Sequence, residues 1–124
     1  MLILLVNTKL QIQKKLENNP LFFGDDIFSI QSGKQAISIL QSFKVDLIVM
    51  GDDSWKDEVK DVLACIDDLK SKPLFYLFAQ ENILNVYKQL DLKAISKFYL
   101  SPVDSKKLLV DIQSMKRGVA GEEI

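Results

Sequence analysis

The most restrictive feature of this sequence is the absence of histidine among its 124 residues. Without histidine, a Ser-His-Asp triad, a Cys-His pair, a histidine general base and a histidine-containing zinc site are all excluded. The chain also has a single cysteine, Cys65. One thiol cannot form an intramolecular disulfide or a thiolate metal cluster, which agrees with a reducing compartment. Any active site must therefore use carboxylates, lysines, tyrosines or backbone amides.

Charge and hydropathy exclude two further classes of partner. The 16 basic and 17 acidic residues give a formal net charge of −1 and are spread along the chain, whereas nucleic-acid binding needs a concentrated basic face. No apolar run is as long as a membrane span, and the apolar N-terminus is too short for a signal peptide and lacks a basic region. The sequence therefore predicts a cytoplasmic, one-domain protein that contacts neither nucleic acid nor membrane through this domain.

Short apolar runs alternate with segments of helical periodicity along the chain. The runs are too short for helices, which favours strands, several of them buried on both faces of a sheet. The predicted strands are Leu2–Val6, Asp26–Ile30, Asp46–Met50, Leu74–Phe78 and Ile95–Leu100.

The intervening segments have apolar residues three and four positions apart, the spacing of an amphipathic helix. A first helix over about residues 8–18 is predicted to end before Pro20, and Ser32 is expected to cap the second. The predicted inner faces of the five helices are Ile12 and Leu16; Ala36, Ile37, Leu40 and Phe43; Val59, Val62, Leu63, Ile66 and Leu69; Ile83, Leu84, Val86, Tyr87 and Leu90; and Leu108, Leu109, Ile112 and Met115.

Five alternating strand–helix units predict a parallel sheet with helices on both faces. Five strands in this length favour the flavodoxin-like (βα)5 fold, a doubly wound α/β sheet of strand order 2-1-3-4-5. Such folds place ligands outside the carboxyl ends of the strands, so a site is expected just after Val6, Met50, Phe78 and Leu100. Residues 1–116 are predicted to form the domain, and residues 117–124, where periodicity is lost, a frayed tail or the start of a linker.

The strings at four strand ends carry a family resemblance. Leu4-Leu5-Val6 is followed by Asn7-Thr8, and the third strand runs Asp46-Leu47-Ile48-Val49-Met50-Gly51. The fourth runs Pro73-Leu74-Phe75-Tyr76-Leu77-Phe78-Ala79, and the fifth ends Phe98-Tyr99-Leu100-Ser101-Pro102. In this order and spacing they resemble the receiver domain of two-component response regulators over about residues 1–116. The family's strings are an acidic pair after strand one, Asp-Leu-Ile-x-x-Asp, Pro with four mostly apolar residues and Thr/Ser-Ala, and an aromatic-containing run with Lys-Pro.

The resemblance fails at every position that carries the family's chemistry. The acidic pair that helps to hold magnesium is replaced by Asn7 and Thr8, and the phosphate-accepting aspartate by Gly51, which has no nucleophile. Phe78 stands where a Thr or Ser senses the phosphoryl group, and Ser101 where a lysine contacts it. The sequence therefore resembles a pseudo-receiver. We expect no metal and no cofactor, and we expect that Gly51→Asp alone would not restore phosphoryl transfer.

Two aspartates follow Gly51 directly and raise the question of a displaced acceptor. Asp52 should point to the opposite face of the strand end, and Asp53 has the right parity but lies about 6–7 Å further out. Capping of the next helix is the favoured role for both, with a displaced phosphate or metal role as the alternative. Two other features stay open: the isomer of the Ser101-Pro102 bond, and whether Trp55 covers the vacated site or anchors a partner. For Cys65, a helix residue near the core is favoured over a redox sensor.

The family binds partners and dimerises mainly through its fourth helix, fifth strand and fifth helix. By resemblance, the candidate interaction surface here is Tyr87, Lys88, Lys97, Tyr99, Lys106 and Lys107. The leading hypothesis is a non-enzymatic signalling module that binds a protein partner, or a second copy of itself, without aspartyl phosphorylation. The alternative is a small-ligand sensor that uses the vacated site among Asn7, Gly51, Phe78 and Ser101, possible only if Phe78 leaves that site open.

Overall fold

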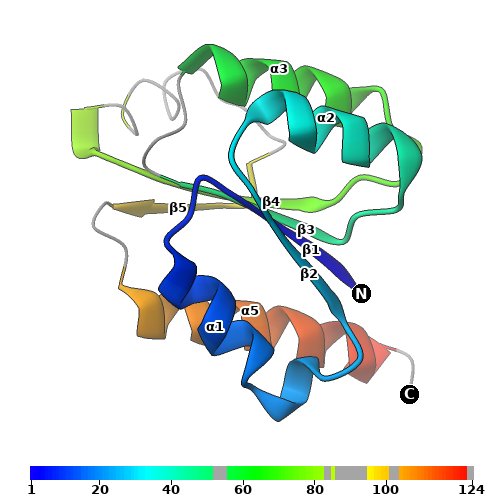
Figure 1. Cartoon of the computed structure of the whole chain (residues 1–124), viewed down its shortest axis with the longest axis vertical. Coiled ribbons are helices and arrows are strands. Elements are labelled where there is room, and N and C mark those ends of the chain that lie inside the picture. Colours follow the sequence, from blue (N-terminus) through cyan, green and yellow to red (C-terminus); the bar gives the residue numbers. More distant parts are fainter. Residues whose placement is uncertain (52–55, 83–84, 86–94, 101–103, 123–124) are drawn as a thin grey trace.

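A computed structural model describes residues 1–51, 56–82, 85, 95–100 and 104–122 of the chain. They form a five-stranded sheet of order β2-β1-β3-β4-β5 in which every neighbouring pair is parallel (Figure 1). The predicted doubly wound, flavodoxin-like α/β fold is therefore confirmed. The strands are β1 (Leu2–Val6), β2 (Asp26–Ile30), β3 (Leu47–Met50), β4 (Leu74–Ala79) and β5 (Lys97–Leu100), within two residues of the predicted bounds.

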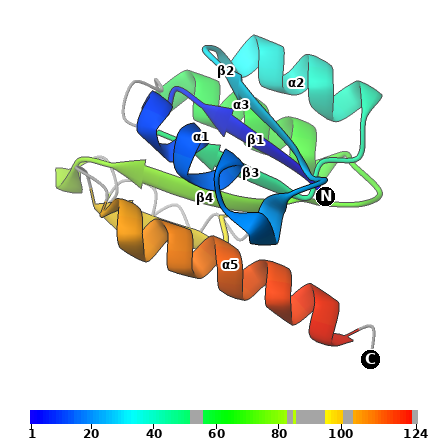
Figure 2. The ribbon, with the colours of Figure 1, turned by 60° about the horizontal axis from the view of Figure 1, so that its bottom comes forward.

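Helices cover both faces of the sheet. The α2 and α3 helices lie on one face and α1 and α5 on the other, as Figures 1 and 2 show from two directions. Their bounds are α1 (Leu10–Glu17), α2 (Gly33–Ser42), α3 (Lys56–Asp67) and α5 (Ser105–Glu122), with a short 3-10 helix η1 (Pro20–Phe22) before β2. The five residues that predict a fourth helix, Ile83, Leu84, Val86, Tyr87 and Leu90, lie outside the described residues.

The inner strands β1, β3 and β4 are buried because alternate side chains contact opposite helical layers. In β1, Leu4 and Val6 pack with α2 and α3, whereas Ile3 and Leu5 pack with α1 and α5. The same alternation runs through β3 and β4 and produces two core clusters, one on each face of the sheet. Continuous apolar runs are what such doubly covered strands require, and this is why the sequence predicts them well.

Local signals set the helix ends as expected. The Ser32 hydroxyl accepts a hydrogen bond from the backbone N–H of Gln35 at 3.3 Å and so caps α2. After α1 ends at Glu17, the Asn19 side chain accepts a hydrogen bond from the N–H of Leu21 and opens η1, with Pro20 at its first position. On α3, Val59, Val62, Leu63 and Ile66 are buried as predicted, and Leu69 packs against the same cluster.

Two helix ends differ from those expected, and the predicted inward position of Phe43 is wrong. Phe43 is 64% exposed, because α2 ends at Ser42 and the backbone of Phe43 is extended, which takes its side chain off the helical stripe. The α5 helix continues to Glu122, so the segment predicted as a frayed tail or the start of a linker is helical as far as residue 122. Helix propagation costs less than nucleation, so a long anchored helix continues through residues that would not start one.

Candidate functional site

The carboxyl ends of β1, β3 and β4 bring together four of the five predicted site positions. The backbone N–H of Asn7 donates to the carbonyl of Ile30 at 3.0 Å, and that of Gly51 donates to the carbonyl of Val6 at 2.9 Å. These bonds extend the sheet pairing past the ends of β1 and β3. Asn7 has φ 54°, a left-handed conformation that asparagine adopts more readily than most residues. The fifth position, Ser101, lies outside the described residues.

The ring of Phe78 fills the space in which a side chain on residue 51 would lie. A Cβ placed on Gly51 would be 2.6 Å from Cζ and 2.9 Å from Cε2 of Phe78, and also 2.6 Å from the backbone oxygen of Asn7. Real Cβ atoms do not approach so closely, and Phe78 is only 2% exposed. Gly51 is thus required by the packing of Phe78, and any side chain there must displace both a buried ring and a backbone carbonyl.

The remaining donors at this site do not suit a magnesium ion. Asn7 and Thr8 offer neutral oxygens in place of carboxylates. The apolar ring of Phe78 lies against Gly51, the position at which the family has its aspartate. The Thr8 hydroxyl is buried and has no hydrogen-bond partner among the described residues. Within the described ranges, no three His, Cys, Asp or Glu side chains gather to hold a metal ion. The magnesium of phosphorylated receivers therefore does not fit the described residues here.

Tyr99 does not lie on an exposed interaction surface, contrary to the prediction. It pairs in register with Phe78 of β4, so its side chain faces the α1 and α5 layer and is only 6% exposed. Its hydroxyl donates a 2.6 Å hydrogen bond to Oδ2 of Asp111 on α5. The rings of Tyr99 and Tyr76 are tilted at 56° with centroids 5.9 Å apart. Tyr99 therefore fastens α5 to the sheet.

Lys97 completes this connection from the outside. Its Nζ is 3.3 Å from Oδ1 of Asp111 and 5.8 Å from the centroid of the Tyr76 ring. Burial would raise the pKa of Asp111, but hydrogen bonds from Tyr99 and Lys97, together with the charges of Lys97 and Lys107, hold the pKa below its ordinary value. Burial raises the pKa of the Tyr99 hydroxyl, and its bond to Asp111 raises it further, so the phenol stays a donor.

Exposed lysines do occupy the described part of the predicted surface. Lys97, Lys106 and Lys107 are exposed, and Lys107 is near enough to Asp111 to affect its pKa. The sequence analysis missed Val110, which is 56% exposed and lies one turn after Lys106 and Lys107 on α5. An apolar residue at an outward helical position was its only signal. Tyr87 and Lys88 lie outside the described residues.

The other open features are largely outside the described residues, namely Asp52, Asp53, Trp55 and the Ser101-Pro102 bond. Cys65 is described and is half-buried on α3, against the core cluster. Burial, and secondarily the charge of Asp68, raises the pKa of its thiol. A raised thiol pKa favours the unreactive protonated form, in agreement with a packing role.

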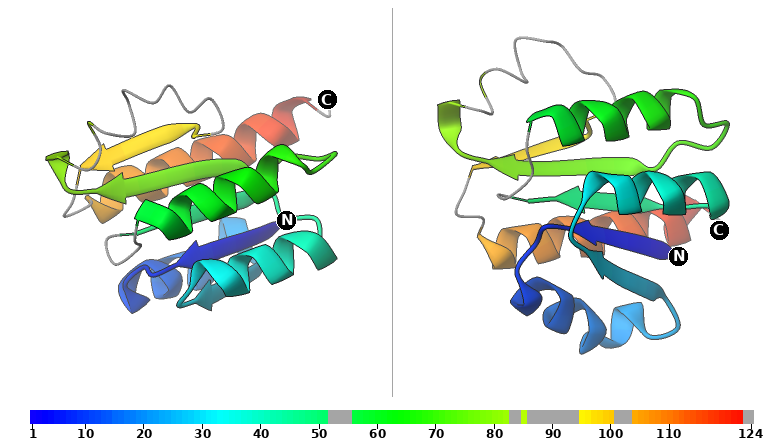
Figure 3. Two further views of the ribbon diagram at one scale, coloured as in Figure 1. Left: turned by 90° about the horizontal axis from the view of Figure 1, so that it is seen from above. Right: turned by 45° about the horizontal axis from the view of Figure 1, so that its top comes forward.

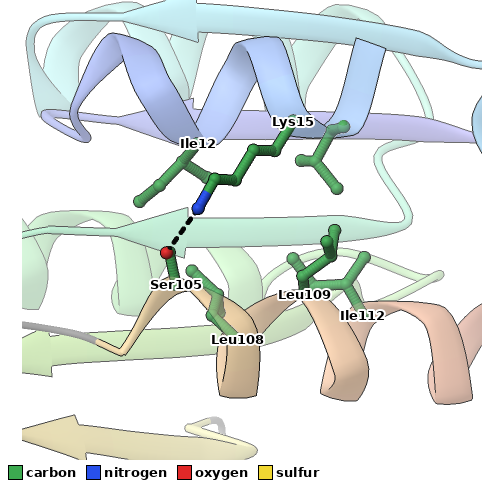
Figure 4. A pocket seen from close by; sticks show the side chains of 7 residues that line it. Ile12, Lys15, Ser105, Leu108, Leu109 and Ile112 are labelled. Atoms are coloured by element: carbon green, nitrogen blue, oxygen red, sulfur yellow. Dashed lines mark hydrogen bonds between the residues drawn. The ribbon is translucent and has the colours of Figure 1, made fainter. Parts of the chain in front are cut away.

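A cavity between α1 and α5 is too small for a ligand. It has a volume of about 10 Å³, and Figure 4 shows its apolar lining and the 2.7 Å hydrogen bond from Lys15 Nζ to the Ser105 hydroxyl beside it. That volume is at the lower limit for one water molecule. The cavity shares no lining residue with the Gly51 site, and it reflects imperfect packing between two helices.

The steric competition between residues 51 and 78 can be measured by a double-mutant cycle. We expect Gly51→Ala to destabilise the domain by about 1–3 kcal/mol, because it overpacks a filled site. In a Phe78→Leu background, which lacks the two ring atoms nearest to residue 51, the added cost should fall by at least about 0.5 kcal/mol. Urea unfolding monitored by circular dichroism measures both values.

Phe75→Leu is the matched control, since Phe75 is equally buried on β4 but faces the opposite helical layer. The cost of Gly51→Ala should be unchanged in that background. Equal costs of Gly51→Ala in the Phe78→Leu and Phe75→Leu backgrounds would refute the competition.

The Asp111 connection predicts a defined pH dependence. Because the folded-state pKa of Asp111 is lowered, its contribution to stability is fully present above the unfolded value of about 3.8 and is lost as pH falls through the lower folded value. The free energy of unfolding of wild type should exceed that of Asp111→Asn at neutral pH, and the difference should shrink below about pH 4. Asp61→Asn, on the exposed face of α3, is the control. A difference that grows on acidification would contradict this assignment.

Comparison with known proteins identifies the fold. No protein-family model and no curated protein sequence matches this chain. Among solved structures, a signal receiver domain of an HD-domain-containing protein from Pseudomonas fluorescens Pf-5 matches with a TM-score of 0.67 and 21% identity, over 91% of each chain. A signal receiver domain of a putative Luxo repressor protein from Vibrio parahaemolyticus matches with a TM-score of 0.73 and 18% identity, over 98% of this chain and 94% of its own.

A third structure of the same fold belongs to a family of redox sensors in the streptococci that evolved from two-component response regulators. It matches with a TM-score of 0.69 and 15% identity, over 98% of this chain but only 53% of its own. In the part of the chain that the structure describes, no helix is long and apolar enough to cross a membrane.

Identities this low establish a shared architecture and nothing finer. The comparisons thus show that this chain has the fold of response-regulator receiver domains.

Proposed function

We propose that this chain is a pseudo-receiver: a non-enzymatic regulatory module that acts by protein–protein contact and does not use aspartyl phosphorylation. The observation that carries the proposal is the ring of Phe78, which lies where a side chain on residue 51 would be. Phosphoryl transfer to this position needs a carboxylate nucleophile and room for the incoming group. The described site supplies neither.

The same observation argues against the small-ligand alternative. Phe78 is 2% exposed and packs against Gly51 and the carbonyl of Asn7, so its aromatic carbons already fill the volume that a ligand would need. Ligand sites are concave and largely preformed, and they bury most of the ligand surface. Opening this one would expose a buried phenylalanine at a cost of about 1.5–3 kcal/mol before any ligand contact is made.

The outer surface of β5 and α5 supports the contact role. Lys106 and Lys107 lie one turn before the exposed Val110 on α5, and the exposed Lys97 pairs with the adjacent Asp111, which favours a partner with acidic residues beside an apolar one. The Tyr99–Asp111 hydrogen bond holds α5 against β5, so this surface is preorganised and loses little conformational entropy on binding. The partner is a second protein or a second copy of this chain.

A receiver scaffold can also serve a different regulatory purpose. The streptococcal redox sensors have this fold and evolved from two-component response regulators. Descent of this kind retains the scaffold while its input chemistry changes, and this agrees with a filled phosphorylation site in an intact sheet.

Phosphorylation is tested with acetyl phosphate and magnesium, beside a receiver domain with an intact site as positive control. We expect intact-protein mass spectrometry to show no phosphoryl adduct on wild type or on Gly51→Asp, because both lack the acidic pair at residues 7 and 8. Circular dichroism establishes that Gly51→Asp is folded. A stoichiometric, hydroxylamine-sensitive adduct on wild type would disprove the proposal.

The interaction surface is tested by charge reversal. Tagged wild type and the double variant Lys106→Glu/Lys107→Glu are used to capture proteins from extracts of the native organism, with quantification by mass spectrometry. The double variant Lys60→Glu/Lys70→Glu is the matched control. It carries the same change in charge at two exposed positions, Lys60 on α3 and Lys70 just after it. We expect specific partners to be depleted at least about tenfold by the α5 variant alone. Equal retention by all three proteins would place the binding surface elsewhere.

A further inference from the structure

The outer edge of β2 is open to a partner strand. Among the described residues, β2 is the terminal strand of the sheet and pairs with β1 alone, as the order β2-β1-β3-β4-β5 requires (Figures 1 and 3). Asp26, Phe28 and Ser29 are exposed, in contrast to the fully buried β3. Its second row of backbone donors and acceptors therefore faces solvent along five residues.

Exposed aromatic rings and a groove accompany this edge. Phe28 is 50% exposed on β2, and Phe23 is 66% exposed in the turn before it, where Gly24 has φ 90°. Residues Phe22–Phe28, with Glu17 of α1, line an open groove of about 300 Å³. Asp25, at the base of this turn, is paired with the N-terminal amino group at 3.2 Å and with Lys116 of α5. These ion pairs hold the turn beside the strand.

The two edge strands, β5 and β2, differ in the residues that discourage pairing with another strand. The β5 edge begins with Lys97, a charged residue of the kind that discourages edge-to-edge pairing. The β2 strand, Asp-Ile-Phe-Ser-Ile, contains no lysine, no proline and no central charge. Its sequence is rich in β-branched and aromatic residues, and edges of this composition pair with other strands unless something prevents it.

We propose that β2 pairs in antiparallel orientation with β2 of a second copy, so that two sheets join into one across a two-fold axis. Centring the pair on Phe28 places the two Phe28 rings opposite one another, a favourable cross-strand aromatic pair. Ile27 then lies opposite Ser29 of the partner subunit, and Asp26 opposite Ile30 of the partner subunit. No like charges face each other within this register.

Charge complementarity selects the antiparallel orientation. Each β2 begins at an acidic end, with the exposed Asp26, and the exposed Lys34 follows its other end at the start of α2. The antiparallel arrangement brings the acidic end of one copy toward the basic end of the other, and toward the N-terminus of α2 with its partial positive charge. A parallel arrangement would instead place acidic ends together.

The size of the contact sets the expected affinity. A five-residue strand pair with two partly exposed phenylalanines from each copy is at or below the low end of stable interfaces, which bury about 1,200 Å² or more. The dimer should therefore be weak and concentration-dependent, with a dissociation constant between about 10 µM and 1 mM. It uses the sheet edge opposite β5, so both contacts can form on one chain.

Analytical ultracentrifugation of the full chain over that concentration range tests the proposal. We expect the average mass to rise from monomer toward dimer, and Phe28→Lys to weaken association at least about tenfold by placing two like charges opposite one another. Phe43→Lys is the matched control, since Phe43 is also an exposed phenylalanine, 64% against 50% for Phe28, but lies past the end of α2. It should dimerise as wild type does. Hydrogen exchange at residues 26–30 should slow as concentration rises in wild type and in Phe43→Lys, but not in Phe28→Lys.

Three outcomes would overturn the proposal. A wild type that stays monomeric up to about 1 mM leaves the edge to an extended segment of another protein. A dimer that survives Phe28→Lys but is lost in Lys106→Glu/Lys107→Glu forms through the β5 and α5 surface instead. Equal weakening by Phe28→Lys and Phe43→Lys would show that added charge alone accounts for the effect.

Discussion

A side chain on residue 51 and the ring of Phe78 compete for one volume at the carboxyl ends of β3 and β4. The ring occupies it, and residue 51 is glycine. Because interiors are packed near crystal density, this exclusion cannot be relaxed by small shifts, least of all where the third contact is the backbone oxygen of Asn7. A side chain on residue 51 and the buried ring of Phe78 are thus mutually exclusive in this packing.

The same aromatic layer continues to the helix that borders the proposed interaction surface. Phe78, Tyr76 and Tyr99 belong to one core cluster with the inner residues of α5. The hydroxyl of Tyr99 then connects this cluster to Asp111, and Asp111 to Lys97 at the surface. The position that receives phosphate in an active receiver is here filled by buried aromatic packing, and the proposed role therefore depends on what the outer face of β5 and α5 binds.

Sequence reasoning recovered the sheet because its inner strands are apolar at every position, a demand of burial on both faces. The family resemblance placed Tyr99 on the interaction surface, and the sequence pattern could not correct this, because Phe98, Tyr99 and Leu100 are all apolar and leave the inner face of β5 undefined. Phe43 continues the helical spacing of Leu40 but follows the last helical residue. The contact between residues 51 and 78 depends on strand register and ring orientation, which no local pattern encodes.

The most direct test of this account is the nuclear Overhauser contact between the α protons of Gly51 and the ring protons of Phe78. Strong cross-peaks and ring-current-shifted Gly51 resonances are expected, and they should be unchanged when magnesium and beryllofluoride are added. Absence of these cross-peaks, together with saturable shifts at Gly51 on adding both reagents, would show an open and functional phosphoryl site and would contradict the account.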